Sequence, residues 1–167
     1  RPRRRSMISI VLATYNERES IETTIKALLA EAPEAMEIVV VDDDSPDNTW
    51  HVVAALELPN VKMIRRIGTR GLASAFNRGI IESRGDNVGW MDADMSMPPA
   101  MIPRMYRMLV DEKYDVVVAS RYAPGGVDEL GEPVAEVAEP AGHHERQAED
   151  PAGDGVRELL VDVDGVR

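Results

Sequence analysis

The sequence predicts an α/β fold in which a mostly parallel sheet carries helices on both of its faces. The first observation is that short apolar runs, rich in β-branched residues, alternate with segments whose apolar residues recur at helical spacing. The second is that most residues of these runs are apolar, without a strict alternation with polar residues, which is typical of strands covered on both faces. The third is the length of 167 residues, which suits one domain with an appendage and suffices to bury a core.

The first half of the chain predicts two strand–helix units. The apolar run Met7–Ala13 predicts a strand, and Asn16 can cap the helix that follows it. One face of that helix is apolar at positions i, i+4, i+7 and i+8: Ile21, Ile25, Leu28 and Leu29. A second strand is expected over Glu37–Val41. Ser45 and Pro46 are a suitable N-cap and first-turn pair for the helix after it.

The second half continues this alternation. The remaining strands are expected over three short runs: Val61–Ile64, Asn87–Met91 and Asp115–Ala119. The remaining helices are expected over two segments: Gly71–Ser83 and Pro99–Asp111. Gly85 lies near the C-cap of the first of these helices. The second turns four apolar residues inward: Ile102, Met105, Met108 and Leu109.

Charge and composition divide the chain into three parts. Residues 1–6 form a basic N-terminal extension, residues 7–126 the predicted domain, and residues 127–167 a tail of net charge −9. All aromatic residues and all methionines precede this tail. High charge without bulky apolar side chains predicts that the tail is mostly disordered, with at most a short element over Val156–Val163. So acidic a tail repels nucleic acid, which we therefore do not expect as a partner.

Composition also excludes several classes of protein. The absence of cysteine excludes a disulfide scaffold and any cysteine-ligated metal site. No apolar run approaches the roughly 18 residues that a membrane-spanning helix needs. The basic start is not followed by the apolar stretch and cleavage site of a signal peptide. An intracellular soluble chain is the default expectation.

Acidic residues follow two of the predicted strands. Asp42, Asp43 and Asp44 follow the second strand, and Asp92 and Asp94 follow the strand that ends before them. Ligands of open α/β sheets bind beyond the carboxyl ends of the strands, so five carboxylates are expected in one crevice. At ~6 Å and an effective dielectric of ~20, each like-charged pair costs about 3 kcal/mol, and a cation must relieve it. Carboxylates at i and i+2 suit Mg²⁺ or Mn²⁺ together with a phosphorylated ligand.

Simpler explanations exist for parts of this acidic pattern. Taken alone, Asp42 or Asp44 is better explained as a residue of a turn or a helix cap. An Asp-x-Asp pair is by itself a weak signal. A calcium loop beginning at Asp42 is excluded because Asp47 and Val53 stand where that loop needs Gly and Glu.

Five motifs, taken together, indicate a specific family. They are ATYNE (13–17), VVVDDDSPDNTW (39–50), RGLASAFNRGI (70–80), MDADMSMPP (91–99) and SRYAPGG (120–126). In this order and spacing they resemble the polyprenyl-phosphate sugar transferases of glycosyltransferase family 2, most closely its dolichol-phosphate mannosyltransferases. The resemblance covers about residues 7–126. It departs from the common pattern at Ala13, where the family usually has Pro, and at Met97, where His is frequent.

The resemblance implies a GT-A, Rossmann-like fold and a set of site residues. The nucleotide pocket would be formed by five residues, the last two against base and ribose: Ala13, Tyr15, Glu17, Val41 and Asp43. The sugar diphosphate would be held through a metal by the DAD motif: Asp92, Ala93 and Asp94. Ser96 would lie near that Mg²⁺ or Mn²⁺ as a third ligand, and Arg121 would meet the phosphates. Asp94 and Arg121 are thereby the expected catalytic residues.

The activity that the resemblance implies is transfer of mannose from GDP-mannose to a polyprenyl (dolichyl) phosphate, with inversion at the anomeric carbon. The transfer reaction would take place at the cytoplasmic face of a membrane, with the enzyme bound peripherally. In some relatives a partner subunit supplies the membrane anchor. Two alternatives stay open: glucosyl transfer from UDP-glucose, and nucleotide-sugar binding without catalysis. The second arises because the motifs stop at Gly126, where relatives continue with basic, membrane-seeking segments and this chain continues with an acidic tail.

Overall fold

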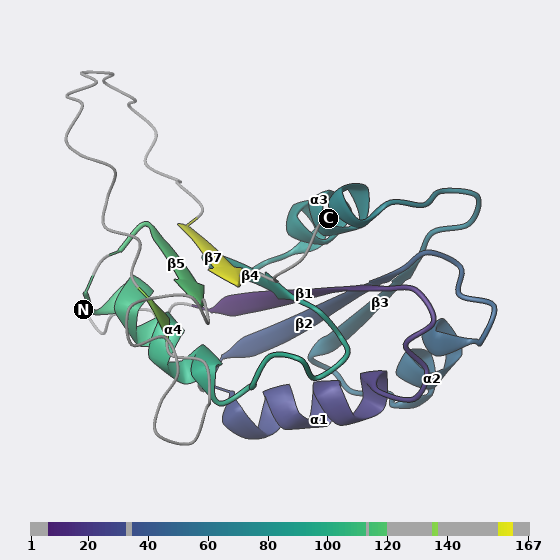
Figure 1. Cartoon of the computed structure of the whole chain (residues 1–167), viewed down its shortest axis with the longest axis horizontal. Helices are drawn as coiled ribbons and strands as arrows, with labels where there is room; N and C mark the ends of the chain where they lie inside the picture. The colour runs from purple at the N-terminus through teal and green to yellow at the C-terminus, as the bar shows by residue number, and fades with distance from the viewer. Residues whose placement is uncertain (1–6, 33–34, 113, 120–134, 137–156, 162–167) are drawn as a thin grey trace.

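The computed structural model describes residues 7–32, 35–112, 114–119, 135–136 and 157–161 (Figure 1). The described strands are β1 (Ile8–Thr14), β2 (Met36–Asp42), β3 (Val61–Arg65), β4 (Asn87–Met91), β5 (Val116–Ala119), β6 (Ala135–Glu136) and β7 (Arg157–Val161). The described helices are α1 (Ile21–Glu31), α2 (Thr49–Ala55), α3 (Leu72–Glu82) and α4 (Met101–Val110). Every strand and helix expected from the sequence between residues 7 and 119 is present, with ends that differ by a few residues.

The strands form one sheet in the order β3-β2-β1-β4-β7-β5-β6. All neighbouring pairs are parallel except β5 and β6, which are antiparallel. The expected mostly parallel sheet is therefore confirmed. Its register places Thr14 beside Asp42 and Leu12 beside Met91. The segments that follow β1, β2 and β4 consequently leave the sheet along the same edge.

Helices cover both faces of this sheet, as expected. Figure 1 shows α1 and α4 on one side and α3 on the other. The larger apolar cluster joins the strands to α1, α2 and α4, and it includes the four inward residues predicted for α4: Ile102, Met105, Met108 and Leu109. A smaller cluster joins Val11, Val39, Val41 and Val88 to Ala75 of α3. Strands that are apolar on both faces thus bury both faces, which explains their sequence pattern.

Two expectations about where helices begin were wrong. The helix after β2 begins at Thr49, not at Ser45, because the Ser45 backbone N–H and hydroxyl both donate to the Asp42 carboxylate. Asn16 does not cap α1; it lies in the left-handed region, with φ of 64°, and α1 follows Ser20. Ser83 is the C-cap of α3, so Gly85 lies near that position, as expected.

Two short strands lie within residues 127–167, which were expected to form a mostly disordered tail. Arg157–Val161 forms β7 between β4 and β5, within the segment for which a short element was expected. Ala135–Glu136 forms β6, which the sequence did not suggest. The tail therefore contributes two strands, although it was expected to be mostly disordered. The rest of it, and the basic residues 1–6, lie outside the described residues.

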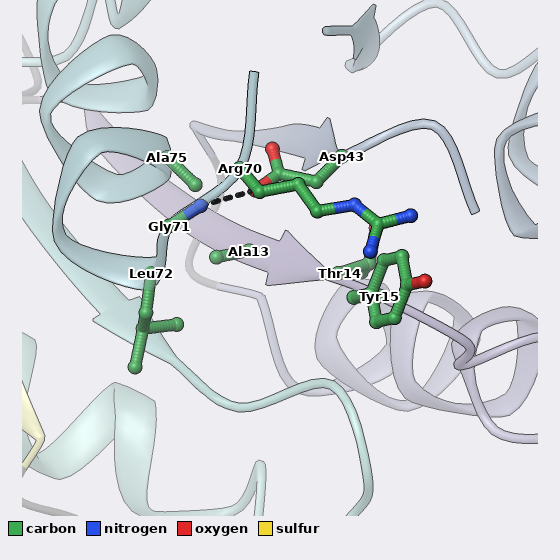
Figure 2. A pocket seen from close by; sticks show the side chains of 8 residues that line it. All are labelled: Ala13, Thr14, Tyr15, Asp43, Arg70, Gly71, Leu72 and Ala75. Atoms are coloured by element: carbon green, nitrogen blue, oxygen red, sulfur yellow. Dashed lines mark hydrogen bonds between the residues drawn. The ribbon is translucent and has the colours of Figure 1, made fainter. Parts of the chain in front are cut away.

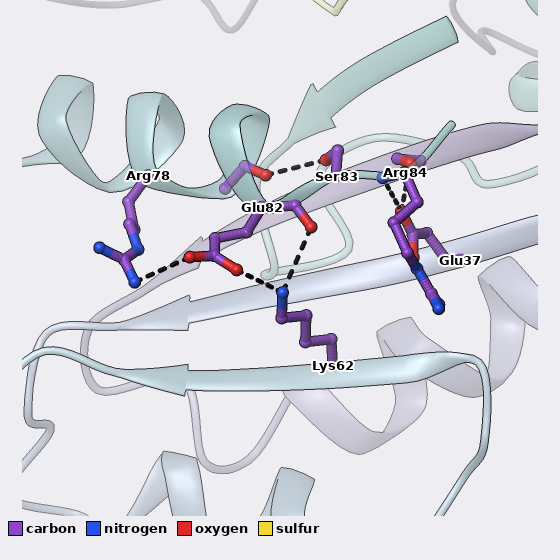
Figure 3. A network of polar contacts seen from close by, with 8 residues as sticks. Glu37, Lys62, Arg78, Glu82, Ser83 and Arg84 are labelled. Atoms are coloured by element: carbon purple, nitrogen blue, oxygen red, sulfur yellow. Dashed lines mark hydrogen bonds and ion pairs between the residues drawn. The ribbon is translucent and has the colours of Figure 1, made fainter. Parts of the chain in front are cut away.

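A polar network fastens the end of α3 to the amino ends of the strands, away from the edge where β1, β2 and β4 end (Figure 3). Glu37 of β2 is buried, accepts a hydrogen bond from the Ser9 hydroxyl at 2.6 Å, and accepts two from Arg84, through its backbone N–H and its Nε. Glu82 of α3 pairs with Lys62 and, at 2.8 Å, with Arg78. These contacts fix the α3 helix axis relative to the sheet.

Candidate functional site

A cavity of about 230 Å³ opens where β1 and β2 end and α3 begins (Figure 2). Its lining comes from the end of β1, the start of the β2–α2 loop and the first turn of α3: Ala13, Thr14, Tyr15, Asp43, Arg70, Gly71, Leu72 and Ala75. A second hollow, of about 400 Å³, shares Asp43 and Arg70 with the first and adds Asp44, Gly68 and Thr69. Ala13, Tyr15 and Asp43, which were expected at a nucleotide pocket, line the first cavity.

Of the three consecutive aspartates that were expected in one crevice, Asp43 and Asp44 line the second hollow and Asp42 lines neither hollow. Asp42 is fully buried and accepts hydrogen bonds from Thr14 and Ser45, so it is a structural residue of the β1–β2 edge. β2 ends at Asp42, and Asp44 has a left-handed backbone conformation with φ of 58°, so the two residues after Asp42 do not continue the alternation of the strand.

Two arginines at the end of β3 pair with the other two carboxylates. Arg66 donates to Asp43 Oδ1 from Nε at 2.6 Å, and Arg65 donates to Asp44 Oδ1 from Nε at 2.6 Å. The cationic partner that the acidic loop requires is thus supplied by the protein itself. Of the five aspartates, only Asp92 and Asp94 remain for a metal ion.

Asp92 and Asp94 follow β4 and differ in their surroundings. Asp92 is half-buried and, in the part of the chain that the structure describes, has no hydrogen bond or ion pair. Burial, and then the negative charge of Asp94, raise the pKa of Asp92. Asp94 is exposed; burial acts to raise its pKa, but hydrogen bonds from the hydroxyl and the N–H of Ser96 outweigh it and lower the pKa. The Ser96 N–H donates to Asp94 Oδ1 at 2.9 Å.

This pair has the character of a partial metal site. A half-buried carboxylate without a partner, beside a second carboxylate, is stabilised when a divalent cation binds between them. Among the described residues no cluster of three or more His, Asp and Glu could enclose a metal by itself. A cation held by Asp92 and Asp94 therefore keeps coordination positions for water or for a phosphorylated ligand. The residues present fit Mg²⁺ or Mn²⁺ bound together with such a ligand.

Three other expected site residues do not line the cavity: Val41, Glu17 and Ala93. Val41 is fully buried in the core cluster that also contains Ala75. Glu17 is half-buried and accepts a hydrogen bond from the Ser20 hydroxyl at 2.9 Å. Ala93 is buried, and its carbonyl accepts a hydrogen bond from Thr24 Oγ1 at 2.8 Å. Arg121 lies outside the described residues.

Several lining residues had been given no role from the sequence. The Arg70 guanidinium lies over the ring of Tyr15, 4.4 Å from its centroid, and so reaches across the cavity mouth (Figure 2). Gly71 and Leu72 follow Arg70 along the wall. Arg70, Gly71 and Leu72 are the first three residues of the motif RGLASAFNRGI, whose spacing predicts a helix and not the loop before it.

Comparison with known proteins identifies the family. The model of the family described as Glycosyl transferase family 2 matches residues 9–155, which is most of the chain. The chain belongs to glycosyltransferase family 2. The resemblance expected from its motifs is confirmed, and the match extends beyond Gly126, where those motifs end.

Individual relatives of this family 2 chain are polyprenyl-phosphate mannosyltransferases. The dolichol-phosphate mannosyltransferase of Pyrococcus furiosus is 42% identical over 122 residues, which are 71% of this chain and 34% of that protein. The undecaprenyl-phosphate mannosyltransferase of Micrococcus luteus is 37% identical over 121 residues, which are 70% of this chain and 49% of that protein. The chain thus spans between a third and a half of the length of these relatives.

A solved structure supports the same fold. A mannosyltransferase from Pyrobaculum calidifontis, in complex with GDP-mannose and Mn²⁺, is 28% identical with a TM-score of 0.57. The likeness covers 71% of this chain and 36% of that one. The α/β, GT-A-like architecture is therefore confirmed. In the described residues no helix is both long and apolar enough to cross a membrane.

Proposed function

We propose that this chain carries the donor site of a metal-dependent polyprenyl-phosphate mannosyltransferase, which moves mannose from GDP-mannose to a polyprenyl phosphate with inversion. The observation that carries the proposal is the pair Asp92 and Asp94, which lacks a cationic partner among the described residues and follows β4 at the sheet edge where the cavity opens. The relatives named as dolichol- and undecaprenyl-phosphate mannosyltransferases support this acceptor class. The Pyrobaculum structure with GDP-mannose and Mn²⁺ supports the donor and a divalent metal.

In this proposal the cavity of Figure 2 receives the nucleoside, with Tyr15 and Arg70 beside it and Asp43 at its wall. Tyr15 offers an exposed ring on which a flat base can pack. Glu17 and Val41 act from behind this wall, because they support the loop and strand that form it rather than lining the cavity.

The diphosphate lies toward Asp92 and Asp94 in this proposal, with Ala93 and Ser96 shaping the loop between them. A bound Mg²⁺ or Mn²⁺ there supplies a counter-charge for the leaving nucleoside diphosphate. Arg121 is proposed to add a forked donor to the phosphates. The attacking acceptor oxygen belongs to a phosphate that is already ionised at pH 7, so the site needs no dedicated general base.

A polyprenyl-phosphate acceptor places this reaction at a membrane surface, peripherally on its cytoplasmic face. A membrane-anchoring partner subunit is part of the proposal. Nucleic acid is not proposed as a partner.

Nucleotide-sugar binding without transfer is a second candidate. The chain spans 34% and 49% of the two relatives, and the described residues of the proposed donor site lie within residues 9–155, which the family model matches. A transfer assay separates the two candidates. The chain is incubated with radiolabelled GDP-mannose, Mn²⁺ and undecaprenyl or dolichyl phosphate in detergent, and lipid-linked label is extracted.

The expected result is lipid-linked mannose that requires both Mn²⁺ and the acceptor. Binding of GDP-mannose without any lipid-linked product supports the second candidate. Label transferred from UDP-glucose but not from GDP-mannose contradicts the proposed donor and favours the glucosyl alternative. The variant Asp94→Asn is the matched control, because it removes one charge from the expected metal site without changing the size of the side chain.

A further inference from the structure

The Arg66 side chain lies directly behind the proposed nucleotide pocket, and all three of its guanidinium nitrogens donate hydrogen bonds. It is only 11% exposed and makes hydrogen bonds to three acceptors on two other segments. Nε donates to Asp43 Oδ1 at 2.6 Å, Nη1 donates to Ser74 Oγ at 3.0 Å, and Nη2 donates to the Gly71 carbonyl at 3.1 Å. The fork geometry of a guanidinium allows this, whereas an ammonium group cannot reproduce it.

Asp43 and Arg66 together hold the two peptide groups that flank the Gly71 Cα. The Gly71 N–H donates to Asp43 Oδ2 at 2.8 Å, so the two oxygens of Asp43 join Arg66 and Gly71. Gly71 has φ of 138°, a conformation that residues with side chains rarely adopt. A peptide in such a conformation persists only where its surroundings determine it, and here Asp43 and Arg66 do so.

The fixed peptide lies in the wall of the cavity. Arg70, Gly71 and Leu72 line the cavity in succession, and Asp43 lines it from β2. Arg66 itself is not among the lining residues. Its effect on a bound nucleoside must therefore pass through the residues that it holds.

Arg65, its neighbour in sequence, has a different role. Its guanidinium pairs with Asp44 and lies over the Trp50 ring, 3.9 Å from the centroid. Among the described residues, none of its hydrogen bonds, ion pairs or ring contacts reaches the loop that carries Arg70 and Gly71. Two adjacent arginines, each paired with one of two adjacent aspartates, thus provide a natural control for each other.

We infer that Arg66 is a positioning residue for the donor nucleotide, which it serves by holding Asp43 and the Gly71 peptide in the shape that the pocket requires. The inference rests on the proposed function. Preorganisation of this kind lowers the free-energy cost of binding rather than adding a contact, so its loss weakens nucleotide affinity. The metal-binding aspartates lie on a different loop, after β4, so the effect falls on the KM for the donor rather than on kcat.

The test compares Arg66→Gln, Arg66→Lys and Arg65→Gln with the unchanged chain, by calorimetric titration of GDP in the presence of Mn²⁺. We expect Arg66→Gln to weaken GDP binding about tenfold, Arg66→Lys to lie between, and Arg65→Gln to stay within about twofold. Equal affinities for Arg66→Gln and Arg65→Gln overturn the inference. Failure of the unchanged chain to bind GDP with Mn²⁺ contradicts the proposed function instead.

A second measurement tests the inference without any ligand. Hydrogen exchange of the Gly71 amide is expected to quicken in Arg66→Gln and not in Arg65→Gln, because only Arg66 supports the Asp43–Gly71 contact. Unchanged exchange at Gly71 in Arg66→Gln overturns the inference even if the chain binds no nucleotide. The double variant Asp43→Asn/Arg66→Gln guards against misfolding, because it leaves no buried unpaired charge. The losses of GDP affinity in Arg66→Gln and in Asp43→Asn are expected to add up to more than the loss in the double variant, since both changes break the same network; full additivity of the two losses overturns the inference.

Discussion

The guanidinium of Arg70 lies over the aromatic ring of Tyr15, 4.4 Å from the ring centroid. The contact joins the loop before α3 to the end of β1, and it crosses the mouth of the cavity that both residues line. At an exposed site a cation–π contact contributes about 0.5–1 kcal/mol, so it is weak enough to rearrange when a ligand enters. Two flat groups at the mouth of a pocket are well suited to pack against a nucleobase.

Replacing Arg70 with Ala is therefore expected to weaken GDP binding by about three- to tenfold, because one wall of the pocket is lost. Isothermal titration with Mn²⁺ present measures the effect. Arg78→Ala is the matched control, since Arg78 lies on α3 and pairs with Glu82 away from the cavity. An affinity for GDP that is the same in Arg70→Ala and Arg78→Ala would show that Arg70 does not contact the nucleotide.

Glu37 is expected to make stability depend on pH. Burial acts to raise its pKa, but hydrogen bonds from Ser9 and Arg84 and the charge of Arg84 outweigh burial, so the pKa lies below the ordinary value of 4.5. A folded-state pKa below the unfolded value means that the stabilisation is complete above pH 4.5 and is lost as pH falls through the folded value.

The variant Glu37→Gln isolates this contribution. At pH 7 it is expected to lower the free energy of unfolding by about 1–2 kcal/mol, because its amide group cannot accept from both donors of Arg84. Urea denaturation at pH 7 and at pH 3 measures the difference from the unchanged chain, which should shrink at the lower pH. A difference that is equal or larger at pH 3 contradicts the assigned ion pair.

Gly79 of α3 is expected to tolerate no side chain. A Cβ at this position would lie 2.2 Å from Val11 Cγ1 of β1. Gly→Ala within a helix ordinarily stabilises by about 1 kcal/mol, whereas overpacking of a core costs about 1–3 kcal/mol. We expect overpacking to dominate, so Gly79→Ala should destabilise the fold in urea denaturation.

The double variant Val11→Ala/Gly79→Ala supplies the control for this close approach. It frees the space that the new methyl group needs, so Gly79→Ala should be less harmful on the Val11→Ala background than alone. An increase in stability on addition of Gly79→Ala to the unchanged chain would show that α3 does not pack on β1 as closely as described.

The order of strands and helices could be predicted from the sequence because it depends on burial. Runs such as Ile38–Val41 are apolar on both faces, and the buried positions of α4 follow one helical stripe. The start of α2 could not be predicted, because Ser45 is a good N-cap by type but is bound to the Asp42 carboxylate. The preference of Ser45 for an N-cap position was therefore overridden by its hydrogen bonds to Asp42.

The candidate site was predictable in part for the same reason. The positions of Asp43 and Asp92 after their strands follow from a parallel sheet, whose carboxyl ends meet at one edge. The pairing of Asp43 with Arg66 joins residues 23 positions apart and depends on how β3 lies against β2. No local pattern reveals such a pairing, so the sequence suggested a metal ion for charges that an arginine neutralises.

The central claim is that Asp92 and Asp94 bind a divalent cation together with a nucleotide-sugar donor. A thermal-shift titration with GDP-mannose or UDP-glucose, each with and without Mn²⁺, tests it most directly when Asp94→Asn is measured beside the unchanged chain. A ligand at ~100 times its dissociation constant adds about 2.7 kcal/mol, which raises the midpoint by several degrees. We expect such a rise with GDP-mannose only when Mn²⁺ is present, and no rise in Asp94→Asn. An equal rise in the variant, or no rise with either donor in the unchanged chain, would contradict the claim.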